Sequence, residues 1–248
     1  MADRPIIFSA PMVRAIRDGR KTQTRRVLKP QPEPWRDYYL EGGCQRADWS
    51  FKMGTRTEDG KRYRFGLWMH CGFHESRFHP LPYAPGDRLW VRETWATWML
   101  APSLPGIGGN LCRDEVTYKA TDPDWHLLER DRRALRDIAS QREDGRCGNW
   151  VIRSPIHMPR WASRITLEVT DVRVQRLQEI NEDDATAEGC SSHGLNLTVA
   201  AGGLLPCIEF FRDTWASMHG PGSWEANPWV AAVSFKRVSP APSDSGSE

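Results

Sequence analysis

The chain has 248 residues, and its 34 Lys and Arg residues nearly balance its 32 Asp and Glu residues, for a formal net charge of +2. This length fits one large domain or a smaller domain with insertions, and the charge balance argues against a protein that coats nucleic acid through a basic surface. No apolar run approaches the roughly 18 residues of a membrane span, and no signal-peptide pattern opens the chain. We therefore expect a soluble, cytoplasmic protein without a membrane partner.

The first predicted element is a short helix near the start of the chain. Ser9 can cap this helix, Pro11 suits its first turn, and Gly19 ends it because glycine tolerates left-handed backbone. Residues 21–28 are expected to be extended, up to the proline-rich stretch 29–34, which neither a helix nor a central strand accommodates.

The middle of the chain has weaker patterns. Residues 35–80 indicate an insertion with one hairpin, because their periodicity is weak and they are rich in Gly, Arg and aromatic residues. Alternation predicts a strand after the turn at Pro85-Gly86-Asp87. The elements expected from there on are a strand, a loop, a short strand and a charged helix, at 88–95, 99–114, 115–120 and 127–146.

The C-terminal part is more regular. Its expected elements are a long strand, a short helix that begins after Asn181, a second helix, a closing strand and a disordered tail, at 165–174, 181–188, 208–218, 229–238 and 239–248. Separated strands with few helices favour an α+β fold, a small and mostly antiparallel β-barrel decorated by helices. We expect one domain over 1–238 with insertions at 35–80 and 99–160.

The segment 19–26 concentrates reactive side chains. Within it, Lys21 offers an amine, Thr24 a hydroxyl and Arg26 a guanidinium, three groups that an enzyme acting on a small polar substrate could use. The alternative is that the basic residues form a solvated edge and that Thr24 is an ordinary strand threonine. In an ideal strand Lys21 and Thr24 point to opposite faces, so they converge only if the chain is twisted or bulged after Gly19.

The pattern Gly19-x-Lys21-x-x-Thr24-x-Arg26 resembles the signature of the ASCH domain family, which has a PUA-like β-barrel fold. Much of that family has glutamate where this chain has Thr24, and threonine there is similar to the bacterial N4-acetylcytidine amidohydrolases. Three further blocks agree in order, at 86–91, 167–170 and 233–236. The resemblance covers less than half of the chain, and the two insertions resemble the longer ASCH-like proteins of phages and prophages.

The resemblance implies a catalytic set of Lys21, Thr24 and Glu188. Lys21 and Thr24 match the motif directly, and aligning Glu182 and Ala185 with the family places its glutamate on Glu188. The implied reaction is hydrolysis of an acylated nucleobase or nucleoside, with no metal and no cofactor. We expect Thr24 as nucleophile, Glu188 as proton acceptor and Lys21 as partner of the oxyanion, with Lys21 as the base an open alternative.

Further residues are candidates for binding the substrate, together with Arg26. Glu93 is in phase with the apolar Leu89 and Val91, so it is either a pocket residue or the partner of Arg92, Arg25 or Arg164.

Of the 12 tryptophans, we expect most in the core, with Trp95 and Trp161 the best candidates for stacking on a base. The residues expected to bind phosphate or RNA backbone, or else to form a solvated turn, are Arg160, Ser163 and Arg164.

Two other functions would use the same pocket: binding of RNA or of a modified base without chemistry, and cleavage of RNA.

A local group of His70, Cys71, His74 and His79 could hold zinc with Cys44, but its spacing fits no standard zinc module, and we expect no metal. The six cysteines form no C-x-x-C pair, and we expect reduced thiols.

Overall fold

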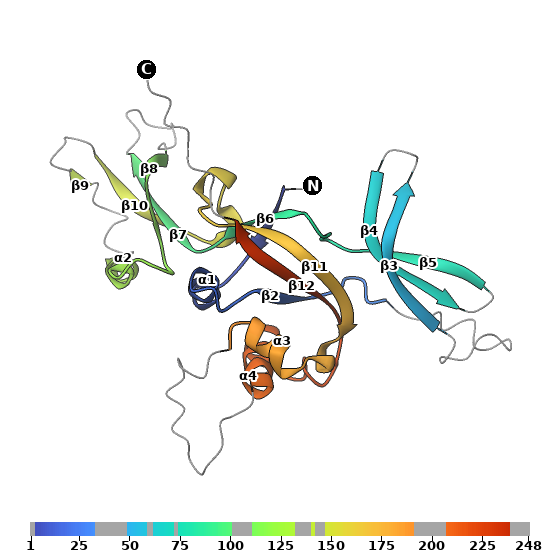
Figure 1. Cartoon of the computed structure of the whole chain (residues 1–248). Coiled ribbons are helices and arrows are strands. Elements are labelled where there is room, and N and C mark those ends of the chain that lie inside the picture. The colour runs from blue at the N-terminus through green and yellow to red at the C-terminus, as the bar shows by residue number, and fades with distance from the viewer. Residues whose placement is uncertain are drawn as a thin grey trace, which may run out of the picture. The chain divides into compact units, whose positions relative to one another are not determined.

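The computed structural model describes residues 3–32, 49–58, 62–71, 74–100, 111–131, 140–141, 147–190 and 207–238. The described chain is α+β, with many strands and few helices (Figure 1), as the sequence predicts. Its strands are β1 (Asp3–Ile7), β2 (Gln23–Val27), β3 (Trp49–Glu58), β4 (Arg62–Cys71), β5 (His74–Pro80), β6 (Arg88–Arg92), β7 (Trp95–Leu100), β8 (Leu111–Tyr118), β9 (Ser140–Gln141), β10 (Cys147–Arg153), β11 (Thr166–Arg176) and β12 (Trp229–Val238).

The described helices are fewer than the strands. They are α1 (Ala10–Arg17), α2 (Trp125–Asp131), α3 (Glu182–Ala187) and α4 (Cys207–His219), with 3-10 turns at Pro155–His157, Arg160–Ala162 and Leu177–Glu179. No helix in the described residues is long and apolar enough to cross a membrane.

Hydrogen bonds between the described strands define three sheets. Their strand orders are β1-β6-β11-β12-β2, β8-β7-β10-β9 and β3-β4-β5, and none of these sheets closes on itself. The chain divides into two compact units: the first contains 19–87 and 168–236, and the second contains 2–18, 88–167 and 237–248.

In the first unit, β2 and β12 pair in antiparallel fashion, and α3 and α4 lie side by side next to β2 (Figure 1). The side chain of Asn181 caps α3 by accepting a hydrogen bond from the backbone of Asp184 at 2.8 Å. On α4, Phe211 and Trp215 are one turn apart and both are buried, so one face of the helix enters the core. The core cluster of these elements consists of Leu177, Ile180, Ala185, Phe211, Trp215 and Val230.

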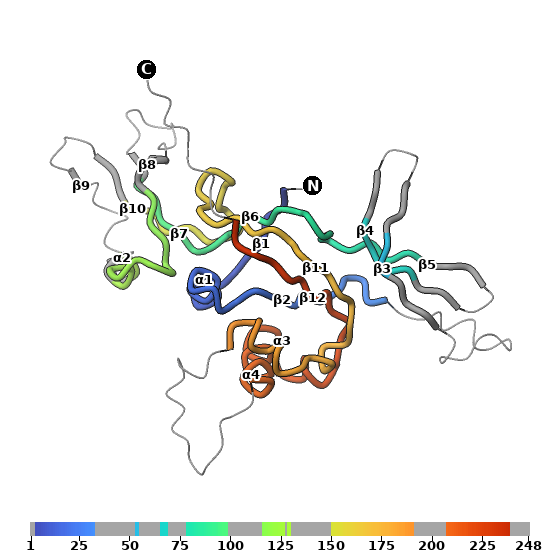
Figure 2. The backbone as a smooth tube through the Cα atoms, viewed as in Figure 1, coloured from blue at the N-terminus to red at the C-terminus, as the bar shows by residue number. Residues whose placement is uncertain are grey.

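In the second unit, β1 pairs with β6 in parallel, and α1 follows β1. Buried Val13, Ala15 and Ile16 form the inner face of α1. The helix ends before Gly19, which has a φ of 76°. Figure 2 shows the backbone running from α1 into β2. A separate cluster of Trp95, Met158 and Ala162 lies where β7 meets the 3-10 turns.

The sequence predicts several elements correctly. The structure confirms the helices expected at 9–18, 181–188 and 208–218 as α1, α3 and α4, and the strands expected at 165–174 and 229–238 as β11 and β12. The extended stretch 21–28 contains β2.

Other expectations are wrong. The described part of 35–80 holds three antiparallel strands rather than one hairpin, and 99–114 contains the end of β7 and the start of β8 rather than a loop throughout. Of the helix expected over 127–146, α2 contains the start up to Asp131, but Ser140–Gln141 is a strand and not helix. The strand β1 was not predicted, because its five residues include only two with an apolar side chain that favours strands. The expected disordered tail lies outside the described residues.

The strand expected over 88–95 is confirmed only in part, since this segment belongs to two strands in different sheets. The first, β6, ends at Arg92, and β7 begins at Trp95. The break falls at Glu93, whose backbone N–H points at the sulfur of Met158 at 3.4 Å instead of continuing the ladder. Alternation alone does not reveal this break, because both halves carry strand-forming residues.

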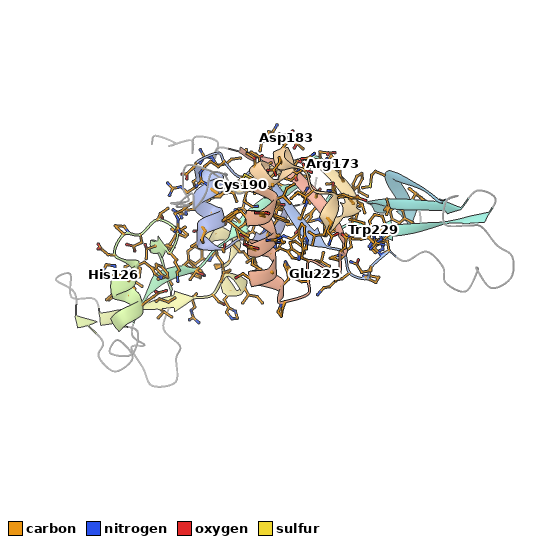
Figure 3. The ribbon with its side chains drawn as sticks, turned by 90° about the horizontal axis from the view of Figure 1, so that it is seen from below. His126, Arg173, Asp183, Cys190, Glu225 and Trp229 are labelled. Atoms are coloured by element: carbon orange, nitrogen blue, oxygen red, sulfur yellow. A yellow bond between two sulfur atoms is a disulfide. The ribbon has the colours of Figure 1, made fainter. Side chains whose placement is uncertain are left out.

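The expectation of reduced thiols fails for two of the six cysteines. Cys190, which follows α3, and Cys207, the first residue of α4, form a disulfide with a Cα–Cα distance of 5.7 Å. Figure 3 labels Cys190 beside these helices. The bond therefore ties the end of α3 to the start of α4.

Candidate functional site

The site begins where α3 meets the chain just before β2. Lys21 and Glu188 form an isolated antiparallel bridge, and the N–H of Thr22 donates to the carbonyl of Ala187 at 2.8 Å. The ammonium of Lys21 donates to the backbone oxygen of Glu188 at 2.8 Å and to its carboxylate Oε2 at 2.5 Å. Lys21 is 2% exposed, so this ion pair lies in the interior of the first unit.

Arg25 joins this pair to a second carboxylate. Its Nη1 donates to Oε1 of Glu188 at 3.2 Å, and its Nη2 donates to Oδ2 of Asp184 at 2.7 Å. Nη1 also donates to the side-chain oxygen of Gln23 at 2.6 Å. Each oxygen of the Glu188 carboxylate therefore accepts a hydrogen bond from a different cation, which fixes the orientation of the carboxylate.

Asp184 has partners on two strands. Arg173 of β11, labelled in Figure 3, donates to Oδ1 of Asp184 at 2.8 Å, and Gln23 donates to the same oxygen at 3.2 Å. Burial acts to raise the pKa of Asp184, but the hydrogen bonds from Arg173 and Gln23 and the charge of Arg25 outweigh it and hold this pKa below its usual value. Asp184 is therefore a charged member of the network.

The environment of Lys21 favours its neutral form more than water does. Burial lowers the pKa of Lys21 below its usual value, and the charges of Arg26 and Arg25 lower it further. The charge of Glu188 and its hydrogen bond act in the opposite direction without reversing the shift. Burial also lowers the pKa of Arg26, against the opposing effects of Tyr83 and Glu188. The amine of Lys21 is thus closer to a useful general base than an exposed lysine is.

Thr24 is not part of this network. It is 4% exposed and lies opposite Val233 of β12 in the ladder. Gln23 and Arg25 hydrogen-bond to each other, so their side chains share one face of β2, and alternation places Thr24 on the other face. The structure brings Lys21 and Glu188 together, and in the described residues it joins neither of them to the hydroxyl of Thr24.

Buried Glu93 and partly exposed Arg164 form an ion pair in the second unit. The guanidinium of Arg164 binds both carboxylate oxygens of Glu93, at 2.9 and 3.0 Å, and the Glu93 side chain is only 1% exposed. Arg164 also packs over the ring of Tyr118, with Cζ at 3.9 Å from the ring centre, and donates to Thr121 at 2.9 Å. Of the two roles left open for Glu93, the structure shows pairing with Arg164.

The remaining candidates of the second unit have structural contacts. Trp95 is 1% exposed and packs edge-on against the half-exposed ring of Trp161, so burial argues against the stacking role expected for Trp95. The hydroxyl of Ser163 lies at 2.8 Å from the carbonyl of Val91, which it can bond as a donor. Arg160 is largely exposed and pairs with Asp3 at 3.2 Å. Of these residues, Arg160 and Trp161 remain accessible to a ligand.

A metal site is not formed by the described residues, since no three of their His, Cys, Asp or Glu side chains are close enough together to hold an ion. His79 is buried, and burial lowers its pKa. Cys71 and His74 are paired residues of the β4–β5 ladder. Cys44, the fifth member of the expected group, lies outside the described residues.

The sequence alone did not reveal four of the six residues of the network around Lys21 and Glu188, namely Gln23, Arg25, Arg173 and Asp184. A signal was present, because Lys21, Gln23 and Arg25 are spaced by two, and polar residues in phase on a buried strand need partners. Asp184 and Glu188 are spaced by four, so both carboxylates lie on one face of α3 and its C-terminal end.

Comparison with known proteins adds no relative, since no protein-family model, no curated protein and no solved structure matches the chain.

Proposed function

We propose that the chain is an ASCH-like protein that hydrolyses the amide of an acylated nucleobase or nucleoside, of the N4-acetylcytidine type. The observation that carries the proposal is the contact between Lys21 and Glu188. The family signature selects Lys21, and alignment within the short helix selects Glu188, 167 residues away. An ammonium and a carboxylate chosen on those grounds lie 2.5 Å apart in a nearly water-free environment.

The chemistry assigns one role to each group. The hydroxyl oxygen of Thr24 attacks the amide carbonyl and passes its proton to Glu188, while Lys21 donates to the oxyanion that forms on the carbonyl oxygen. The C–N bond then breaks as the nucleobase nitrogen takes up that proton, which leaves the acyl group on Thr24. Water hydrolyses this ester, regenerates the hydroxyl and releases the carboxylic acid.

The placement of Thr24 on the other face of β2 bears on this mechanism. For Thr24 to act, the ligand must reach both faces near the start of the strand, or the segment after Gly19 must rotate when the ligand binds. If neither happens, a water molecule is the nucleophile. Lys21, with its lowered pKa, is then the base, and it takes the proton of that water. The two routes differ in whether loss of the Thr24 hydroxyl stops the reaction.

The fold assigned in this proposal is a PUA-like barrel. Its support is the antiparallel pairing of β2 with β12, which brings the signature segment against the closing strand 229–238. The helix that carries the glutamate packs on β2, as the site requires.

The test is incubation of the protein with N4-acetylcytidine, followed by chromatography for cytidine and acetate. We expect K21M and E188Q to lose at least about a hundredfold in kcat, because each removes a group that acts only in the transition state. The matched controls are K119M and E129Q, which break the exposed Lys119–Glu129 pair in the second unit. Retention of near-normal turnover in K21M would rule out this function.

Thr24 has its own matched control in Thr22, an exposed threonine two residues away. If Thr24 is the nucleophile, T24V abolishes turnover and T22V does not. If water is the nucleophile, T24V retains turnover, while K21M still abolishes it.

Binding without chemistry is the second candidate function. It is favoured by the absence of Thr24 from the Lys21–Glu188 network in the described residues, since binding does not need a nucleophile. Binding of N4-acetylcytidine or RNA without release of acetate supports this candidate, and shortening of a labelled single-stranded RNA supports a ribonuclease.

A further inference from the structure

A pocket in the second unit is lined by three arginines. It has a volume of about 370 Å³, which suits a group of nucleotide size. Arg14, Arg17 and Asp18 line it from the end of α1, Ala120 and Thr121 from the turn after β8, and Arg237 from the end of β12. No residue of the Lys21 network is among them.

Hydrogen bonds to backbone oxygens hold two of the three guanidiniums in place. Nη1 of Arg14 donates to the carbonyl of Ala120 at 3.4 Å, and Nη1 of Arg237 donates to the carbonyl of Arg17 at 3.3 Å. A guanidinium has five N–H donors. Each of these hydrogen bonds therefore uses one donor, and a carbonyl oxygen does not neutralise the charge of the guanidinium.

The pocket carries a surplus of positive charge. Among the residues that the structure describes, none of the three arginines forms an ion pair with an acidic side chain. Asp18 subtracts one charge, and the carbonyl end of α1 subtracts about half a charge more. The three positive charges of the guanidiniums exceed these two negative contributions together, so the pocket favours an anion. Arg14 and Arg17 also stabilise the end of α1, but that role does not account for Arg237, which comes from another element.

Thr121 adds a neutral donor. Its hydroxyl oxygen accepts a hydrogen bond from Nη1 of Arg164 at 2.9 Å, so its own hydrogen must point elsewhere. Because Arg164 is held by Glu93, the orientation of this hydroxyl is set from the buried side. The lining thus offers several guanidinium N–H groups and one O–H, a donor set that matches the oxygens of a phosphate group.

We propose that this pocket binds the phosphate group of a nucleotide or of an RNA strand. Arg17 and Arg237 supply charge-assisted hydrogen bonds, Arg14 adds a fixed charge, and Thr121 donates from its hydroxyl. The pocket recognises the phosphate and not the base, so a nucleoside without phosphate does not occupy it. This site is independent of the Lys21 chemistry and stands if that chemistry fails.

The experiment measures binding of cytidine 5′-monophosphate, cytidine and a single-stranded oligocytidylate to the full chain by calorimetry. We expect the monophosphate or the oligonucleotide to bind at least about tenfold more tightly than cytidine, and R17Q/R237Q to remove this difference. For the oligonucleotide, the slope of log K against log salt should fall by about 0.7 for each phosphate that the variant no longer neutralises. If R17Q/R237Q weakens binding of the monophosphate alone, the pocket takes the phosphate of a nucleotide. If it weakens binding of the oligonucleotide alone, the pocket takes the phosphate of an RNA strand.

The matched control is R212Q, which removes an exposed arginine of α4 in the first unit. It should leave binding within about twofold of the wild type, because an exposed charge outside the pocket changes affinity little. Equal weakening in R212Q and R17Q/R237Q, or no preference of the wild type for the phosphate-bearing ligands, overturns the proposal. K21M should retain the preference, which separates this site from the proposed hydrolase site.

Discussion

The ammonium of Lys21 lies 2.5 Å from Oε2 of Glu188, although 167 residues separate them in the chain. Burying two charges costs several kcal/mol for each ion, and their attraction offsets this only when further hydrogen bonds complete both groups. Here Arg25 supplies the second hydrogen bond to the carboxylate, and the backbone oxygen of Glu188 supplies the second acceptor for the amine. The pair is therefore stable only as part of a larger network, and the network is what the following predictions test.

Arg25 should be the residue on which this network depends most. Its side chain has no exposed surface and binds both Asp184 and Glu188. We expect R25M to destabilise the protein by about 3–5 kcal/mol, because it leaves two buried carboxylates with fewer cationic partners. Urea denaturation measures the loss, and R212M, at the exposed Arg212–Asp213 pair, should change stability by less than about 0.5 kcal/mol. Equal effects of the two variants would contradict the central role of Arg25.

The pH dependence of turnover separates the two roles of Lys21. Burial lowers the pKa of Lys21 below 10.5. If its charged form stabilises the oxyanion, kcat falls as the pH rises through that lowered pKa; if its neutral form is the base, kcat rises there instead. K21R keeps its charge over this range. If the charged side chain stabilises the oxyanion, K21R should therefore retain part of the activity, and its kcat should no longer fall at alkaline pH. A profile that is flat up to pH 10.5 would contradict both roles.

Acid should weaken the first unit through Asp184. The folded-state pKa of Asp184 lies below its usual value of 3.8, because the effects of Arg173, Arg25 and Gln23 outweigh burial. The folded state therefore binds this proton less readily than the unfolded state, and Asp184 contributes stability above its usual pKa. That contribution is lost as the pH falls from this value through the folded pKa. In D184N the melting temperature should be lower near neutrality and should fall less steeply over this acidic range. If the melting temperature of D184N falls with acid as steeply as that of the wild type, Asp184 is not the source of this acid sensitivity.

The sequence predicts those parts of the fold that are set by local chemistry. The Asn181 cap with its acidic first turn, the proline near the start of α1 and the glycine after it each define a helix end. The alternation predicts the strand β11, in which the buried residues Leu167 and Val169 alternate with more exposed ones before the pattern shifts at Thr170-Asp171. In each case the signal lies within one element.

What the sequence does not predict depends on partners from distant elements. The break between β6 and β7 coincides with the pairing of Glu93 with Arg164 and with its contact to Met158, and neither partner is visible from residues 88–95 alone. The role of Arg25 is hidden for the same reason, since its two carboxylate partners lie on α3 and directly after it, more than a hundred residues later in the chain. Segment 35–80 shows a further limit, because its three strands pair mainly with one another and carry no strong alternation.

The disulfide between Cys190 and Cys207 should contribute to stability through the segment that it closes. It links residues 17 positions apart, and a crosslink of that length reduces the entropy of the unfolded chain by an amount equivalent to about 3 kcal/mol. We expect a reducing agent to lower the melting temperature of the wild type, and C190S/C207S to melt at the reduced temperature with or without the agent. The double variant is the control for reduction at any other cysteine. A wild type that melts at the same temperature in both conditions, with all its cysteines reactive toward a thiol reagent, would show that the bond does not form in solution.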